Sequence, residues 1–414
     1  MPRLPQLAAA AILFGLVGPA LWLAFGWRLI LRLLERAARA VLRLPRSPAD
    51  AATDKEAARL AASPGLDLPG AVHEFVPTST SPPVSLHVVR LPPPTGVPPS
   101  GRTVLLVHGF PEYWAAWAPA MAALAGADGH AVAALDLRGY GESDKPGAVG
   151  AYGIGALAAD VVAVAEHLRA GAGAGARRIT LVGHDWGGQV AGHAAALGGP
   201  ALFDGVALLC APFPGVGLRH AGWRQAARSW YIFFFQAPLL GEEMMGGQAA
   251  AAIGGLVAER RAEAAARAAD DSARAAAVEA AAGLPPAPPL LTFSAAQEDA
   301  GFRAAFLRPG AARAAVSYYR ALVRGLLGLV SPRPATPAQA AAFKAALRTP
   351  GGFPLPLLML YAARDVALGA ELLSGTDALV PDLELRVLDS SHWLPAARPR
   401  EVIARLRAFV KRTG

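Results

Sequence analysis

The segment "RRITLVGHDWGGQV" at residues 177–190 constrains the fold more than any other part of the chain. It is typical of a short buried strand, a sharp turn and the start of a helix, with Gly183, Gly187 and Gly188 where the backbone turns tightly. Such a turn lifts the residue at its tip above the end of the strand, beside the N-terminus of a helix. The pattern G-x-S-x-G has a serine at this tip, whereas this chain has Asp185.

Apolar runs of strand length recur from residue 72 onward, with helix-like stretches between several of them. They read "SLHVVRL", "TVLLVHG", "AVAALDLR", "ITLVGHD", "GVALLC", "PLLMLY" and "LELRVLD". Strands that alternate with helices, and that are apolar along nearly their whole length, predict a mostly parallel α/β sheet. The polar motifs follow the carboxyl ends of these runs, which is where open α/β sheets place their sites.

The strand pattern stops between about 216 and 345. This gap predicts a helical cap over 216–345, inserted between two parts of the sheet domain at 71–215 and 346–414. Within the cap, 247–289 is almost entirely Ala, Gly, Arg and Glu. That composition predicts a low-complexity insertion with no function of its own.

The N-terminal region, 1–46, has a different character. Residues 4–27 carry no charge, and a bilayer span needs about 20 such residues. The next segment, "RLILRLLERAARAVLRLPR", predicts a basic amphipathic helix. Together they predict a single-pass membrane anchor and a linker over 47–70, with the catalytic domain on the cytoplasmic side. An organelle transit peptide is an alternative, because the region is rich in Arg and its first acid is Glu35.

A carboxylate at position 185 selects a particular chemistry. It is ionised at neutral pH and displaces a leaving group at saturated carbon, which turns Asp185 into an ester. Water must then attack the carboxyl carbon, a step that needs a general base and an oxyanion hole. His392 in "LRVLDSSHWLP" and Asp365 in "LLMLYAARDVALG" follow the last two strands, in the order expected of base and orienting acid. Asp389 is the weaker alternative for the acid.

The loop "LLVHGFPEYWAAW" follows an earlier strand. We expect the backbone N–H of Phe110 to form the oxyanion hole with the N–H of Trp186. Three other residues of this loop, His108, Pro111 and Trp114, are expected to line the substrate site.

Other classes of function have little support. The histidines lack metal-ligand spacing, so we expect no metal and no cofactor. The net charge of +8 comes from scattered Arg, apart from the N-terminal cluster, and predicts no nucleic-acid partner. The single cysteine, Cys210, excludes an intrachain disulfide and is expected to be a buried thiol.

The motifs "HGFPE", "RGYG", "SDKP", "GHDWGG" and "SHW" together resemble the signatures of the epoxide hydrolases of the α/β-hydrolase superfamily. The resemblance covers roughly 72–235 and 305–410. It implies an α/β-hydrolase fold and hydrolysis of epoxides to vicinal diols. The N-terminal anchor is similar to the membrane-bound branch of this family, and with an apolar cap it favours lipophilic, fatty-acid-like epoxides.

The resemblance also implies two cap tyrosines that donate hydrogen bonds to the epoxide oxygen. "YIFFFQAP" and "SYYRAL" match the two family segments and give Tyr231 and Tyr319, with Tyr318 as the alternative in the second. Phe235 of the first segment is expected to line the substrate site.

Three alternatives share this fold. A haloalkane dehalogenase has the same aspartate and histidine but usually places Asn after "HG", where this chain has Phe110. Fluoroacetate dehalogenases usually carry Arg after the nucleophile, where Trp186 stands. A non-catalytic binding protein typically loses a member of the triad, whereas this chain keeps all three candidates.

Overall fold

The computed structural model describes residues 31, 66–172, 178–216, 220–237, 241–242, 245, 249–328, 346–347 and 349–414. The predicted anchor, residue 31 excepted, and most of the predicted linker lie outside the described residues. Among the helices that are described, none has the length and apolar character that a membrane crossing requires.

Eight strands form one sheet in the order β1-β2-β4-β3-β5-β6-β7-β8. The strands are β1 (Val72–Pro77), β2 (Ser85–Leu91), β3 (Thr103–Val107), β4 (Ala131–Leu135), β5 (Ile179–His184), β6 (Phe203–Leu209), β7 (Leu357–Ala362) and β8 (Leu383–Leu388). The β1–β2 and β2–β4 pairs are antiparallel, and all later pairs are parallel. This confirms the predicted mostly parallel α/β sheet.

Burial explains which strands the sequence reveals. Every residue of β5, β6 and β7 is buried, because helices cover both faces of the centre of the sheet. Strand β1 at one edge is largely exposed, and its sequence "VHEFVP" has no continuous apolar run. The predicted apolar runs therefore correspond to β2–β8 and not to β1.

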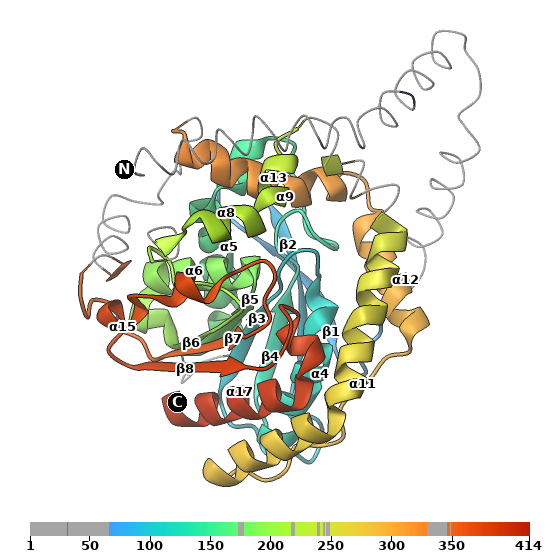
Figure 1. Cartoon of the computed structure of the whole chain (residues 1–414). Helices are drawn as coiled ribbons and strands as arrows, with labels where there is room; N and C mark the ends of the chain where they lie inside the picture. The colour runs from blue at the N-terminus through green and yellow to red at the C-terminus, as the bar shows by residue number, and fades with distance from the viewer. Residues whose placement is uncertain are drawn as a thin grey trace.

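Four helices cover the two faces of the sheet (Figure 1). Helices α4 (Ala118–Asp128) and α17 (Pro399–Thr413) pack together on one face. Helices α5 (Ile154–Gly171) and α6 (Trp186–Leu202) pack together on the other. Helix α6 follows β5 directly, so the predicted turn lies between these two elements.

Further helices lie between β6 and β7 in the sequence. They are α8 (Trp223–Arg228), α9 (Trp230–Phe234), α11 (Ala249–Ala281), α12 (Ala295–Phe306) and α13 (Ala311–Leu326). The short elements elsewhere are η2 (Trp114–Trp117), η3 (Val149–Tyr152), η4 (Ala370–Leu373), α15 (Thr376–Leu379) and α16 (Leu394–Ala397). Helices α8, α9 and α13 gather at one end of the sheet, whereas α11 runs down the side of the molecule (Figure 1).

The Ala-rich stretch is therefore one long helix for most of its length. Helix α11 packs against α16 and α17 of the sheet domain as well as against α12. Its position beside the core, close to the loops that follow β7 and β8, matters for the site described below.

Candidate active site

Asp185 stands on the turn between β5 and α6. Its backbone has a φ of 53° and a ψ of −121°, and residues with a side chain seldom adopt a positive φ. The N–H of Asp185 donates to the carbonyl of Leu209 in β6 at 3.0 Å. Its side chain is 15% exposed. The turn thus fixes the backbone and leaves the carboxylate accessible at the carboxyl edge of the sheet.

The loop after β3 holds one oxygen of this carboxylate. The N–H of Phe110 donates to Oδ1 of Asp185 at 2.7 Å. Gly109 allows the approach, because a Cβ at that position would lie 2.5 Å from the Cβ of Asp185. Trp186 begins α6, where helix geometry leaves the backbone N–H without an intrahelical acceptor. The N–H of Phe110 therefore contacts the carboxylate of Asp185, and the N–H of Trp186 belongs to the residue that follows Asp185.

The other carboxylate oxygen faces a histidine. Oδ2 of Asp185 lies 3.4 Å from Nε2 of His392. On the far side of the ring, Nδ1–H donates to Oδ2 of Asp365 at 2.7 Å. Oδ1 of Asp365 accepts the N–H groups of Ala367 and Leu368, each at 2.8 Å. Asp365 is therefore held from both sides and fixes the orientation of the imidazole.

Two alternatives from the sequence are bonded elsewhere. Asp389 accepts from Arg267 at 2.7 Å and from Arg364 at 2.9 Å, and its side chain is largely exposed. The hydroxyl of Tyr318 donates to the carbonyl of Arg138 at 2.7 Å. Asp389 is therefore bonded to two arginines and not to His392, and the hydroxyl of Tyr318 is bonded to the backbone and not free to donate to a substrate.

The charges around His392 favour its imidazolium form. Burial opposes that charge, but hydrogen bonds to Asp185 and Asp365 raise the pKa of His392 to about 10. Burial also opposes ionisation of Asp365, and the bond from His392 nevertheless holds the pKa of this carboxyl below its usual value. An imidazolium cannot accept a proton, so His392 becomes a base only when one of its anionic neighbours loses its charge.

Tyr231 of α9 and Tyr319 of α13 lie together above the site. Their ring centroids are 5.5 Å apart, and the ring of Tyr319 lies 5.1 Å from that of Phe110 and 5.3 Å from that of Trp186. Burial, together with the charge of Asp185, raises the pKa of Tyr231, and burial beside Tyr231 raises that of Tyr319. Both phenols therefore keep their protons and remain hydrogen-bond donors.

One further predicted residue, Phe235, lies in the same aromatic group. The ring of Phe235 lies 5.0 Å from that of Tyr319 and 5.8 Å from that of Phe110. Pro111 follows Phe110 through a cis peptide bond. The apolar lining of the site thus comes from both the cap and the loop after β3.

His108 and Trp114 differ from their predicted role as substrate contacts. His108 is fully buried: its Nε2 accepts the N–H of Leu137 at 3.0 Å, and its Nδ1 lies 2.8 Å from the carbonyl of Gly109. Both ring nitrogens are therefore engaged with the backbone. Trp114 is buried and packs edge-on against His73 of β1, with ring centroids 5.6 Å apart. Both side chains support the loop from behind.

Sequence reasoning missed Glu112, which lies in the same loop. Its Oε2 accepts from Nδ1 of His184 at 2.9 Å, and Nε2 of His184 donates to the carbonyl of His392 at 3.0 Å. Burial opposes ionisation of Glu112, but His184 and Arg260 hold its pKa well below the usual range. An acid in an otherwise apolar loop was the signal that could have revealed it.

One cluster of possible metal ligands lies in the described part of the chain, formed by Cys210, Asp365 and His392 within 4.8 Å of one another. Asp365 and His392 are already bonded to each other. Burial raises the pKa of the Cys210 thiol well above its usual value, whereas a metal needs the thiolate. These donors fit a hydrogen-bonded pair with a structural thiol beside it.

Comparison with known proteins gives a family for the fold. Residues 102–398 match the model of the alpha/beta hydrolase fold. A solved epoxide hydrolase from an endophytic Streptomyces is 28% identical with a TM-score of 0.55, covering 83% of this chain and 96% of that one.

Curated relatives match over a shorter stretch. Epoxide hydrolase B of Mycobacterium tuberculosis is 42% identical over 133 residues, which is 32% of this chain and 34% of the relative. Epoxide hydrolase 4 of Mus musculus is 36% identical over 143 residues, 34% of this chain and 37% of the relative. The alignments thus span about a third of the length of these relatives.

The pKa of His392 provides a direct test of this geometry. Asp185→Asn removes one of the two anions that stabilise the imidazolium, so the pKa of His392 should fall below its value of about 10 in the unchanged protein. Titration of the imidazole by ¹H–¹⁵N NMR measures both values. Asp382→Asn, which removes an exposed carboxylate bonded to Arg412, is the control and should leave the pKa nearly unchanged. Equal pKa values in the protein and its Asp185→Asn variant would contradict the assignment.

Proposed function

This chain belongs to the alpha/beta hydrolase family, and on that basis we propose that it hydrolyses epoxides to vicinal diols through a covalent ester of Asp185. One arrangement carries the proposal: a carboxylate with one oxygen held by a backbone N–H and the other beside His392, below two protonated tyrosines. The identity to epoxide hydrolases over about a third of the chain supports the same reaction.

The first step is attack by Oδ2 of Asp185 on an epoxide carbon. Backside displacement breaks the carbon–oxygen bond on the opposite face, so the alkoxide forms toward the cap. Tyr231 and Tyr319 lie there, and their hydrogen bonds stabilise the developing charge. The alkoxide takes a phenolic proton, which leaves an ester between Asp185 and the substrate. His392 remains protonated during this step.

The second step is hydrolysis of that ester. Ester formation removes the negative charge of Asp185, so the pKa of His392 falls. The imidazolium then gives up its proton to the phenolate left by the first step, which restores the tyrosine and makes the ring a base. Nε2 then takes a proton from water while the oxygen attacks the carboxyl carbon. Negative charge develops on Oδ1, where the N–H of Phe110 already donates at 2.7 Å and the N–H of Trp186 is the second donor. The intermediate breaks the bond between the carboxyl carbon and Oδ2 and expels the diol alkoxide, which takes the proton from His392. The carboxylic acid left on Asp185 then gives its proton to His392, and the site returns to its resting charges.

We further propose that the substrates are lipophilic and that residues 4–27 anchor the protein in a membrane, with the catalytic domain on the cytoplasmic side. An aromatic lining supports the first point, since the rings of Phe110, Tyr319 and Phe235 pack together and the backbone N–H of Phe110 donates to Asp185. The uncharged run and its Arg-rich flank support the second.

His392→Gln should separate the two chemical steps. The variant should still form the ester but release almost no diol, with ester hydrolysis slower by about 100- to 10,000-fold or more. Intact mass after mixing with styrene oxide should increase by one substrate.

In the unchanged protein, a single turnover in ¹⁸O water should give diol without label, because its new oxygen comes from Asp185. Labelled diol in the first turnover would mean that water attacks the epoxide directly. A bromoalkane in parallel, with bromide release followed, identifies a dehalogenase.

Loss of either cap tyrosine should slow ester formation and leave ester hydrolysis unchanged. By analogy with one oxyanion-hole donor, Tyr231→Phe and Tyr319→Phe should each slow alkylation about 100-fold or more, and the double variant should nearly abolish it. Rapid-quench single turnovers measure both rates. Tyr318→Phe is the matched control on the same helix, because the Tyr318 hydroxyl is bonded to the carbonyl of Arg138. Parental alkylation rates in both single variants would exclude these donors.

Membrane anchoring is tested by extraction. The full chain should stay in the membrane fraction after a carbonate wash, because an inserted span resists conditions that strip peripheral proteins. A variant that starts at residue 47 should be soluble and retain epoxide hydrolysis. Release of the full chain by carbonate would contradict the anchor and leave the proposed chemistry untouched.

A further inference from the structure

Glu263, on helix α11, contacts both loops of the catalytic pair. One oxygen of its carboxylate, Oε1, accepts from Nη2 of Arg364 at 2.6 Å and from the backbone N–H of Ser391 at 3.1 Å. Arg364 directly precedes Asp365, and Ser391 directly precedes His392. We infer that Glu263 is a positioning residue that holds Asp365 and His392 in register, an inference that rests on the proposed function.

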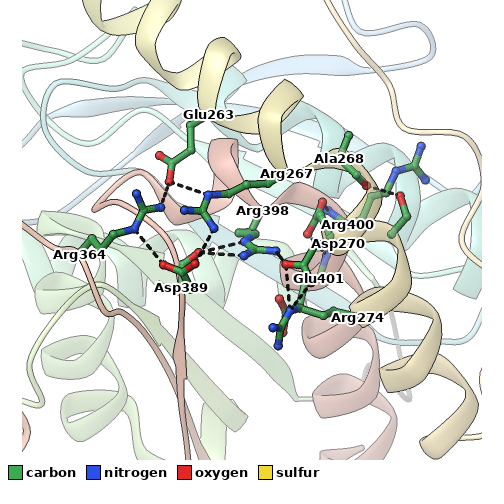
Figure 2. A network of polar contacts seen from close by, with 12 residues as sticks. Glu263, Arg267, Ala268, Asp270, Arg274, Arg364, Asp389, Arg398, Arg400 and Glu401 are labelled. Carbon is green, nitrogen blue, oxygen red and sulfur yellow. Dashed lines mark hydrogen bonds and ion pairs between the residues drawn. The ribbon is translucent and has the colours of Figure 1, made fainter.

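The carboxylate belongs to a closed ring of charges (Figure 2). Arg364 also donates to Asp389 at 2.9 Å, Asp389 accepts from Arg267 at 2.7 Å, and Arg267 lies 3.4 Å from Glu263. Two members, Glu263 and Arg267, come from α11, and the other two come from the loops after β7 and β8. The two carboxylates and the two guanidinium groups carry equal and opposite charge. The ring therefore ties both catalytic loops to one face of one helix.

The same helix contacts the other side of the catalytic histidine. Arg260 lies one turn before Glu263, and its guanidinium carbon is 3.7 Å from the ring centroid of Trp393, the residue after His392. Nη1 of Arg260 is 3.4 Å from Oε1 of Glu112. Glu112 in turn holds His184, which donates to the carbonyl of His392. Ser391 and Trp393, which flank His392 in the chain, thus both contact α11.

Positioning matters because His392 has to face two groups at once. Nε2 lies 3.4 Å from Asp185 while Nδ1 is bonded to Asp365, and a water must fit against Nε2 in the second step. A displacement of about 1 Å in a reacting group costs about 100-fold in rate. Asp185 does not depend on Glu263, since the turn after β5 and the N–H of Phe110 fix its carboxylate. Loss of Glu263 should therefore affect the second step alone.

The test compares three variants in single turnovers with styrene oxide. Glu263→Ala should slow ester hydrolysis by about 10- to 100-fold, leave alkylation close to the parental rate, and make the ester accumulate. Glu263→Gln should recover most of the rate, because its amide oxygen still accepts from Ser391 and Arg364. The control is Arg274→Ala, at an exposed residue of the same helix that pairs with Asp270, and it should hydrolyse the ester normally. If Glu263→Ala does not fold, Glu263→Asp replaces it, because its carboxylate is withdrawn by one methylene group.

Equal losses in alkylation and hydrolysis, or no loss in either, would overturn the inference. The Nδ1–H proton resonance of His392 reports its bond to Asp365 without any turnover. It should shift or broaden in Glu263→Ala and stay in place in Glu263→Gln and Arg274→Ala. If the unchanged protein forms no ester, the proposed function fails, and the resonance still decides the inference: an identical signal in the unchanged protein and in Glu263→Ala overturns it.

Discussion

The close contact between β5 and the first turn of α6 is the constraint on which the rest of the site depends. A Cβ on Gly183 would lie 2.2 Å from the carbonyl oxygen of Gly187, and a Cβ on Gly187 would lie 2.2 Å from that of Val107. No other residue fits at these distances, so the glycines let the helix begin directly against β3 and β5. Asp185 is held at its positive φ by this packing. Its carboxylate then becomes the fixed point that the other loops approach.

Electrostatics explains how one site could perform the two proposed steps, which require opposite protonation states of His392. In the resting site the imidazole lies between two anions, and the pKa of His392 is raised accordingly. In the proposed reaction, ester formation removes the charge of Asp185, which is one of the two charges that keep His392 protonated. Burial strengthens this coupling, because charges interact more strongly away from water. The order of the proposed steps, ester formation first and attack by water second, thereby follows from the placement of three charges.

Helix α11 illustrates how composition can conceal contacts with the rest of the chain. The stretch is mostly Ala, Gly, Arg and Glu, which predicted an insertion without function. Its charged residues 260, 263, 267 and 270 nevertheless recur every three or four positions, which places them on one helical face. Each of them contacts the sheet domain. Periodicity within the low-complexity stretch was the signal that composition obscured.

The sequence by itself determined the parallel sheet, the turn that carries Asp185, and the order of Asp365 and His392. These depend on local signals, namely apolar runs, glycines and residues just after strand ends, and a parallel sheet brings such ends to one edge. Tertiary structure decided between neighbours of the same kind. Tyr318 and Tyr319 differ only in the direction each takes from α13, and Asp365 and Asp389 only in what surrounds their carboxylates. The contacts of α11 were likewise decided by packing, because helix orientation and partners distant in the chain depend on the assembled core and not on any local segment.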